Sequence, residues 1–258
     1  MSVFTVSDIH GCYEIWKQIE DYLLPTDELY VIGDVIDRDP NGFLIYEEMV
    51  THDNIHIIKG NHEEMALAAL EQLAIGNYRH KDVDFWFDPQ NGGKESWETI
   101  KDLPKEYLYA FIDFFKGLPE QYEYENANGQ YIILNHCGFT PYKKYWRYED
   151  REHFKDQWPE KDVWKDVVVV HGHTTVDTML FYCGFYKSKS DNKYRSSQAN
   201  RANYKENYVP EMITYCDGHK INIDMGLPWS NVCCLLDLDT LKPIYFEREV
   251  SVSAECRA

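Results

Sequence analysis

The run Val3-Phe4-Thr5-Val6-Ser7-Asp8-Ile9-His10-Gly11 decides the fold of this chain. Its first four residues are β-branched or aromatic, and such a run predicts a short strand. Apolar residues at helical spacing then predict a helix over residues 13–24. Because Asp8 and His10 stand between this strand and this helix, we expect them at the carboxyl end of the strand, where open α/β sheets form their sites.

The same order of strand, polar motif and helix occurs twice more. Predicted strands at residues 29–32 and 55–58 are followed by predicted helices at residues 43–50 and 63–75. The motifs between them are Gly33-Asp34-Val35-Ile36-Asp37-Arg38 and Gly60-Asn61-His62-Glu63. Three successive units of this kind predict a parallel or mixed sheet, with the three polar motifs at one edge.

The second half of the chain supplies two more motifs. Apolar runs at residues 131–134 and 167–170 predict strands, which lead into Asn135-His136-Cys137-Gly138 and His171-Gly172-His173-Thr174. The other predicted elements are a helix at 107–115, a strand pair at 232–238 and 244–246, and polar loop or cap segments at 76–98 and 184–208. Since the chain has no internal repeat and no evident linker, we expect one domain over residues 1–258, with the two polar segments as insertions.

The composition is that of a globular protein, with 44% hydrophobic and 27% charged residues in a chain of 258. The net charge of −18 disfavours non-specific binding to nucleic acid, which depends on Lys and Arg at the phosphates. The seven cysteines contain no C-x-x-C pair, which argues for a reducing compartment and against structural zinc. With no signal-peptide pattern and no apolar run of about 18 residues, we expect a cytoplasmic protein that does not bind membranes.

Six side chains of the five motifs are typical ligands of divalent metal ions. They are Asp8, His10, Asp34, Asn61, His136 and His173. Two divalent ions about 3.5–4 Å apart need a bridging ligand, and a carboxylate can offer one oxygen to each ion. The amide oxygen of Asn61 adds a ligand without adding negative charge. We therefore expect two divalent metal ions, with Mn²⁺ first and Fe, Zn or Ni as alternatives that suit the same ligands.

The first three motifs resemble the signature of the calcineurin-like metallophosphoesterases. The matching patterns are Asp8-x-His10-Gly11, Gly33-Asp34-x-x-Asp37-Arg38 and Gly60-Asn61-His62-Glu63. Within that superfamily they resemble the phosphoprotein phosphatases and their bacterial and phage members, over residues 3 to about 238. The resemblance implies an α/β fold of four αββα layers, in which two mixed β-sheets are flanked by helices.

The resemblance also implies which residues hold each metal ion. One ion would be held by Asp8, His10 and Asp34. The other would be held by Asp34 as the bridge, Asn61, His136 and His173. The run Asn222-Ile223-Asp224-Met225-Gly226 resembles a family motif. Its Asp224 would support the metal ligands without binding a metal ion itself.

The implied reaction is phosphomonoester hydrolysis by direct attack of a hydroxide that bridges the two metal ions. His62 would be the general acid for the leaving group, positioned by Asp37. Arg38 would hold phosphate oxygens, because a guanidinium binds two of them at once and stays charged. The enzyme would most resemble a protein serine/threonine phosphatase, with a phosphorylated protein or a small phosphoester as its substrate.

A second phosphate-binding arginine is expected near residue 150. The run Asp150-Arg151-Glu152-His153 resembles the Trp-Asp-Arg-x-His run of bacterial members, although its lead-in differs. Arg151 is therefore the first candidate, and Arg147, which follows Trp146, is the competing one.

Three features border the predicted substrate site. Asp39 stands where the family usually has Gly, and its charge could weaken the hold of Arg38 on phosphate unless its side chain faces solvent. Thr175 stands where nuclease-like branches commonly carry a second His, which favours the phosphatase branch and leaves His171 a structural role. The segment 184–208 carries six basic and two acidic residues, which predicts either a solvated loop or a contact with an anionic substrate.

Two other functions compete with a protein phosphatase. A symmetrical dinucleoside polyphosphate (Ap4A-type) hydrolase would use the same metal ligands and the same acid. A non-catalytic phosphate-binding scaffold would be expected to have lost a ligand or His62, and all of them are present. The sequence does not predict the oligomeric state.

Overall fold

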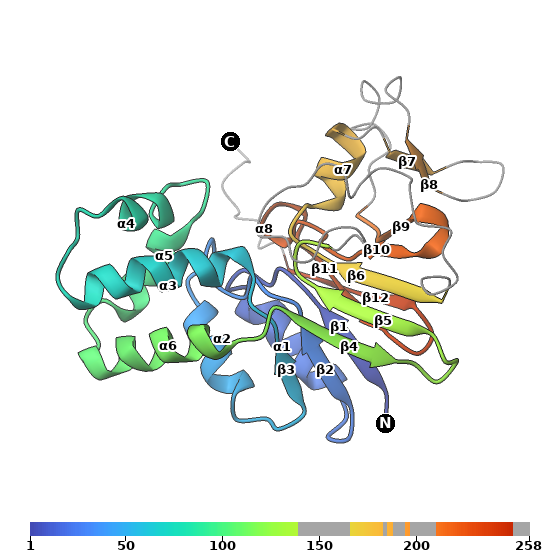
Figure 1. Cartoon of the computed structure of the whole chain (residues 1–258), viewed down its shortest axis with the longest axis horizontal. Helices are drawn as coiled ribbons and strands as arrows, with labels where there is room; N and C mark the ends of the chain where they lie inside the picture. Colours follow the sequence, from blue (N-terminus) through green and yellow to red (C-terminus); the bar gives the residue numbers. More distant parts are fainter. Residues whose placement is uncertain (139–165, 183–184, 188–193, 197–209, 250–258) are drawn as a thin grey trace, which may run out of the picture.

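A computed structural model describes residues 1–138, 166–182, 185–187, 194–196 and 210–249 (Figure 1). Most of these residues lie in two five-stranded sheets and the helices beside them. Among the described residues, no helix is long and apolar enough to cross a membrane.

The first sheet is built around the strand that opens the chain. Its strands, in spatial order, are β12 (Lys242–Glu247), β11 (Val232–Asp237), β1 (Val3–Val6), β2 (Glu28–Val31) and β3 (Ile55–Ile57). Strands β1, β2 and β3 are parallel, whereas β11 pairs antiparallel with both β1 and β12. The predicted pairing of the last two strands is thereby confirmed.

The second sheet is also mixed. Its strands, in spatial order, are β4 (Gln121–Glu125), β5 (Tyr131–Asn135), β6 (Val167–His171), β10 (Lys220–Asn222) and β9 (Ile213–Tyr215). Its central strands β5, β6 and β10 are parallel, so the motifs that follow β5 and β6 lie at the same edge. A separate strand pair consists of β7 (Phe185–Lys187) and β8 (Tyr194–Ser196).

Strand β11 contributes to two of the hydrophobic cores. Cys233 and Leu235 belong to the core between the first sheet and its helices, whereas Cys234 and Leu236 belong to the core shared with the second sheet. This alternation follows from the two-residue period of a strand. Strands buried on both faces need cover on both sides, which explains the expected arrangement of two mixed sheets flanked by helices, here confirmed.

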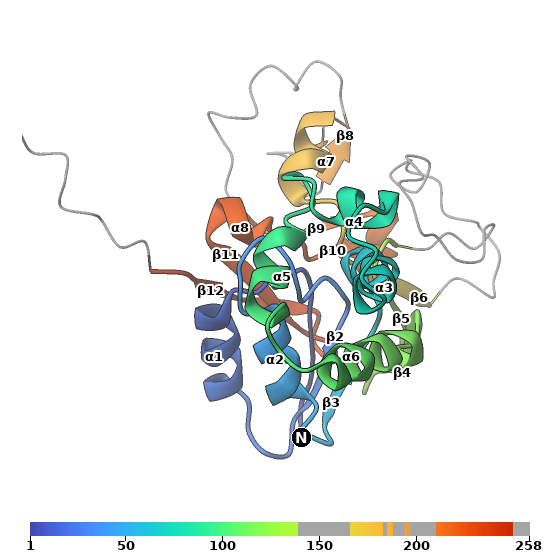
Figure 2. The same ribbon diagram turned by 90° about the vertical axis from the view of Figure 1, so that its left-hand side faces the viewer.

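Four helices bury their apolar sides against the first sheet (Figures 1 and 2). They are α1 (Tyr13–Tyr22), α2 (Gly42–Met49), α3 (Asn61–Ala74) and α6 (Lys105–Gly117). Each lies within one or two residues of its predicted start, because apolar residues at helical spacing define these helices in the sequence.

The segment 76–98 contains two short helices where the sequence predicted a polar loop or cap. They are α4 (Lys81–Trp86) and α5 (Gly93–Ile100), joined by a turn at Gly92, whose φ is 75°. Six and eight residues are too few to give a clear helical period, which explains the difference. The remaining helical segments are α7 (Val176–Tyr182), the 3₁₀ turn η5 (Cys216–Gly218) and α8 (Leu227–Ser230).

Candidate metal and phosphate site

The backbone is strained where the motifs follow their strands. Six motif residues other than glycine have a positive φ, a conformation that side chains disfavour. They are Asp8 (53°), His10 (47°), Asp34 (54°), Asp37 (73°), Arg38 (72°) and His173 (66°). Such strain costs about 1–3 kcal/mol per residue and collects at functional sites, where the surrounding structure enforces it.

Glu63 ties the second motif to the third. Its carboxylate accepts hydrogen bonds from the backbone N–H groups of Asp34 (2.9 Å), Val35 (2.9 Å) and Gly60 (2.8 Å). The side chain is fully buried, at the first turn of α3. The sequence analysis assigned no role to Glu63, although a Glu three residues after a helix N-cap is a known capping signal.

Asp34 lies at the centre of a group of imidazoles. Its Oδ2 atom is 3.2 Å from Nε2 of His136, 3.8 Å from Nε2 of His62 and 4.0 Å from Nε2 of His10. Nε2 of His10 is also 3.8 Å from Oδ1 of Asp8. The structure therefore brings together all the ligands expected for the first metal ion, with His62 beside them.

Asn61 lies between the last two predicted ligands. Its Oδ1 atom is 2.9 Å from Nε2 of His136 and 2.7 Å from Nδ1 of His173. The thiol of Cys137 is a third donor here, since one possible ligand atom each from His136, Cys137 and His173 lie within 4.8 Å of one another. Burial raises the pKa of the Cys137 thiol to about 11, so the thiol is neutral without a cation nearby.

The hydrogen bonds of His136 fit a cluster that binds a cation. Nδ1 of His136 lies 2.8 Å from the carbonyl oxygen of Ile32, to which it must donate, so Nε2 faces the oxygens of Asp34 and Asn61. Two atoms with lone pairs repel at this distance unless a proton or a metal ion lies between them. Nδ1 of His10 likewise donates to the carbonyl of Ile36, at 3.0 Å. Carbonyl partners of this kind orient metal-binding imidazoles, so the residues fit divalent cations.

The pKa shifts of the buried carboxyl groups also favour a positive charge close to them. Burial raises the pKa of Asp8 well above its ordinary value, and the nearby Asp224 carboxylate raises it further. Burial raises the pKa of Asp224 to about 6. Burial alone would raise the pKa of Asp34 as well, but the imidazoles of His136 and His62 hold it well below its ordinary value. The acidic pair Asp8 and Asp224 is thus unfavourable without a cation, in line with a supporting role for Asp224.

His62 is held by the partner that the sequence predicted. Its Nδ1 lies 2.7 Å from Oδ2 of Asp37, and Trp86 donates its indole N–H to the same oxygen at 2.9 Å. Burial lowers the pKa of His62, but the carboxylates of Asp34 and Asp37 outweigh burial and raise it. Ser96 accepts the backbone N–H of Asp37 at 2.9 Å. Trp86 and Ser96 come from the 76–98 segment, to which the sequence analysis assigned no site residue.

Arg38 projects between the two imidazoles that flank the centre. Its guanidinium donates to Nε2 of His10 at 2.9 Å and approaches Nε2 of His62 at 3.3 Å. Its Nε is buried and has no hydrogen-bond partner among the described residues. The guanidinium carbon lies 4.6 Å from the ring centroid of Trp229, a cation–π contact that the sequence analysis did not anticipate.

Asp39 is paired with a residue far along the chain. Its carboxylate accepts a hydrogen bond of 2.8 Å from Arg248, which follows β12. The negative charge of Asp39 is therefore paired with the positive charge of Arg248. The side chain of Asp39 is 22% exposed, so it reaches solvent only in part.

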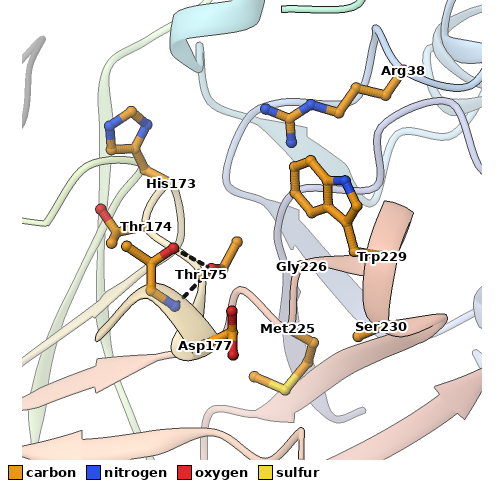
Figure 3. A pocket seen from close by; sticks show the side chains of 10 residues that line it. Arg38, His173, Thr174, Thr175, Asp177, Met225, Gly226, Trp229 and Ser230 are labelled. Atoms are coloured by element: carbon orange, nitrogen blue, oxygen red, sulfur yellow. Dashed lines mark hydrogen bonds between the residues drawn. The ribbon is translucent and has the colours of Figure 1, made fainter. Parts of the chain in front are cut away.

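A pocket of about 600 Å³ opens beside Arg38 (Figure 3). Its lining residues are Arg38, His173, Thr174, Thr175, Asp177, Thr178, Met225, Gly226, Trp229 and Ser230. Thr175 does not join the metal cluster. Its hydroxyl accepts the backbone N–H of Thr178 at 3.1 Å and so caps α7. His171 is buried away from the cluster, with Nε2 at 2.7 Å from the hydroxyl of Tyr215.

The predictions on the second phosphate-binding arginine and on the basic segment concern residues that mostly lie outside the described part of the chain. Arg147 and Arg151 lie outside the described residues, as does most of the basic segment 184–208. The choice between the two arginines and the role of that segment therefore stay predictions.

Known proteins are similar to this chain in sequence and in fold. The model of the calcineurin-like phosphoesterase family matches residues 1–246. The symmetrical bis(5'-nucleosyl)-tetraphosphatase of Delftia acidovorans is 21% identical over 145 residues, which are 55% of this chain and 46% of that protein. Serine/threonine-protein phosphatase 2 of Salmonella typhimurium is 30% identical over 137 residues, which are 52% of this chain and 57% of that protein. The chain thus spans about half the length of these relatives.

A crystal structure supports the likeness in fold. The metallophosphoesterase from Sphaerobacter thermophilus has a TM-score of 0.51 and 15% sequence identity, with 96% of this chain and 89% of that chain covered. At this identity the likeness concerns the fold alone.

Proposed function

The chain belongs to the calcineurin-like phosphoesterase family, and on this premise we propose that it hydrolyses phosphate esters at two divalent metal ions, with His62 as the general acid. One ion would be held by Asp8, His10 and Asp34, and the other by Asp34, Asn61, His136 and His173. Bound divalent ions generate a nucleophile from water at neutral pH and neutralise charge on the phosphoryl oxygens. Mn²⁺ is the first candidate.

The pair of His62 and Asp37 is the observation that carries this proposal. Asp37 takes the Nδ1 side of the ring, at 2.7 Å, so Nε2 is left facing the cluster. Asp34 and Asp37 raise the pKa of His62, which favours the protonated imidazole. A protonated imidazole in this position can give its proton to the leaving oxygen as the bond to phosphorus breaks.

Arg38 has the right surroundings to bind the phosphoryl group. Its present partners, Nε2 of His10 and Nε2 of His62, both have other proposed roles, as metal ligand and as proton donor. If His10 held a metal ion and His62 a proton at Nε2, neither nitrogen could accept a hydrogen bond, and the guanidinium would be free to bind phosphate. Its N–H groups, including the Nε–H that has no partner in the described part of the chain, could then donate to phosphate oxygens.

The first proposed substrate class is a phosphorylated serine or threonine of a protein. It is supported by the match to the Salmonella phosphatase and by Thr175, which caps a helix where a nuclease-like site would have another histidine. The second class is a dinucleoside polyphosphate cleaved symmetrically. It is supported by the match to the Delftia tetraphosphatase and by the pocket beside Arg38.

A substrate panel with added Mn²⁺ tests the proposal. Phosphoserine and phosphothreonine peptides, diadenosine tetraphosphate and p-nitrophenyl phosphate would be assayed with the wild type and with His62→Asn. We expect hydrolysis by the wild type and a large loss in the variant. A metal-loaded wild type that is inert towards all of them would instead support a phosphate-binding scaffold, and rapid hydrolysis of only the dinucleotide would reverse the order of the two substrate classes.

A further inference from the structure

Trp229 is a large apolar side chain that is exposed to solvent. It is 66% exposed, although it stands beside Arg38 at the edge of the proposed catalytic site. Figure 3 shows the indole and the guanidinium on one side of the pocket, with His173 and Thr174 on the other. An exposed aromatic ring next to a phosphate-binding group is typical of a ligand-binding site.

The backbone at Trp229 is held in a tight turn. Trp229 lies in α8, a single turn between the left-handed residues Gly226 (φ 68°) and Asn231 (φ 58°). The N–H of Gly226 donates to Oδ1 of the buried Asp224 at 2.8 Å, and the N–H of Trp229 donates to Gly226 at 2.9 Å. A pre-positioned ring loses little freedom on binding, which favours a stacking surface.

The other pocket walls combine apolar and polar groups. Met225 is buried and gives an apolar surface, whereas Thr175, Asp177 and Ser230 supply hydroxyl and carboxylate groups. The hydroxyls of Thr175 and Ser230 already form hydrogen bonds within the protein, so the exposed indole of Trp229 is the main surface that the pocket offers a ligand. A nucleoside has a flat base that can stack and sugar hydroxyls that can donate to a carboxylate. A cavity of about 600 Å³ is in the range that small-molecule ligands fill.

We propose that this pocket binds a nucleoside of a nucleoside polyphosphate, with its base stacked on Trp229 and its sugar near Asp177. The inference rests on the proposed hydrolysis and assigns Trp229 as a specificity-determining residue for it. Arg38 covers one face of the indole, and the exposure of Trp229 to solvent leaves room for the base. The phosphate chain then lies near Arg38. In the reaction, a water oxygen bonds to phosphorus and the bond from phosphorus to the bridging oxygen breaks. The leaving nucleotide keeps that oxygen and takes up one proton.

Binding without turnover provides the first test. ADP would be titrated into the Mn²⁺-loaded wild type, Trp229→Ala, Trp229→Tyr and the control Tyr78→Ala, which removes an aromatic residue of similar exposure (59%) that does not line the pocket. Since stacking of one base contributes about 1–3 kcal/mol, we expect Trp229→Ala to weaken binding roughly 5- to 150-fold. Tyrosine should retain most of the affinity, and the control all of it. Equal ADP affinity in wild type and Trp229→Ala would overturn the proposal.

Turnover separates this proposal from its competitors. Trp229→Ala should raise the KM for diadenosine tetraphosphate much more than the KM for a phosphoserine peptide. An equal loss with both substrates would show that Trp229 only positions Arg38. A loss confined to phosphotyrosine or p-nitrophenyl phosphate would assign the pocket to a phenol ring. A wild type that binds ADP through Trp229 but hydrolyses nothing would refute the proposed hydrolysis while leaving the nucleoside pocket intact.

Discussion

His62 Nδ1 lies 2.7 Å from Oδ2 of Asp37, and this contact connects the ends of two strands with the 76–98 segment. Trp86 donates to the same carboxylate, at 2.9 Å. The imidazole is therefore oriented by a chain of buried hydrogen bonds, with Nε2 towards the predicted ligands. Such a chain fixes which ring nitrogen can exchange a proton with a substrate.

The first prediction concerns His62→Asn. The amide can fill the space of the ring but cannot deliver a proton, so kcat should fall by about 10²- to 10⁴-fold. The loss should be largest for alkyl phosphates, whose leaving oxygen needs the proton, and smaller for p-nitrophenyl phosphate. Steady-state kinetics on both esters would measure it. The general-acid role is wrong if the two substrates lose equally or if full activity remains.

The second prediction concerns Trp86→Phe. Removing the indole N–H leaves the buried Asp37 carboxylate with one partner fewer, which should destabilise the protein by about 1–3 kcal/mol. Because burial is the main cause of the raised pKa of Asp37, losing this donor should raise it further and shift the activity–pH profile. The matched control is Trp97→Phe, a buried indole of the neighbouring α5. If both variants have the same pH profile as the wild type, Trp86 only fills space.

The sequence predicts the strands of the first sheet and the metal cluster well, for physical reasons. Strand β1 and the helices of the first half have clear periods, and the strand ends place Asp8 and Asp34 at one edge. Residue type then predicts the chemistry, because carboxylate, imidazole and amide groups gathered at one edge suit divalent metals.

The residues that surround the cluster could not be predicted in the same way. Trp86 and Ser96 meet Asp37 across 49 and 59 residues of sequence, from helices too short to show a period. The ion pair of Asp39 and Arg248 spans 209 residues. Nothing in the local pattern around Trp229 predicts that it contacts Arg38, since the contact depends on how the two sheets bring α8 to the site.

The third prediction concerns Gly60→Ala. A Cβ at this position would lie 2.1 Å from Oδ1 of Asp34 and 2.5 Å from its backbone nitrogen. Such crowding should cost about 1–3 kcal/mol of the free energy of unfolding and displace the proposed bridging ligand. Urea unfolding and Mn²⁺ titration would measure the two effects.

Gly117→Ala is the control for this substitution. Among the described residues, no atom outside its own helix backbone and chain neighbours lies within 4 Å of a Cβ there, and the residue ends α6. Its stability should be unchanged or higher by about 0.4–1 kcal/mol, with unaltered metal binding. If Gly60→Ala behaves like Gly117→Ala, the close approach at Asp34 has been overestimated.

The fourth prediction concerns Asp39 and Arg248. Their ion pair is partly exposed, with side-chain exposures of 22% and 36%, so it should contribute less than about 1 kcal/mol. A double-mutant cycle with Asp39→Asn and Arg248→Met would give the coupling energy. Arg248→Met alone leaves the Asp39 charge near Arg38, and should raise the KM for phosphoesters. If the KM rises equally in Asp39→Asn, the charge of Asp39 has no influence on Arg38.

The last prediction concerns acid stability and His171. Burial lowers the pKa of His171 to about 3, from an ordinary value of 6.5. Between these pH values the unfolded chain binds a proton that the folded protein does not. The contribution of His171 to the free energy of unfolding is therefore complete above the ordinary pKa and is lost as the pH falls below it.

His171→Gln removes this titration and keeps a hydrogen-bonding side chain next to Tyr215. In metal-free protein, the slope of unfolding free energy against pH should decrease by up to about 1.4 kcal/mol per pH unit below the ordinary value. Urea unfolding at several pH values would measure it, with His52→Gln as the control because His52 is 42% exposed. If the two variants have the same slope, His171 is protonated in the folded protein, and its contact with Tyr215 must differ from the one described.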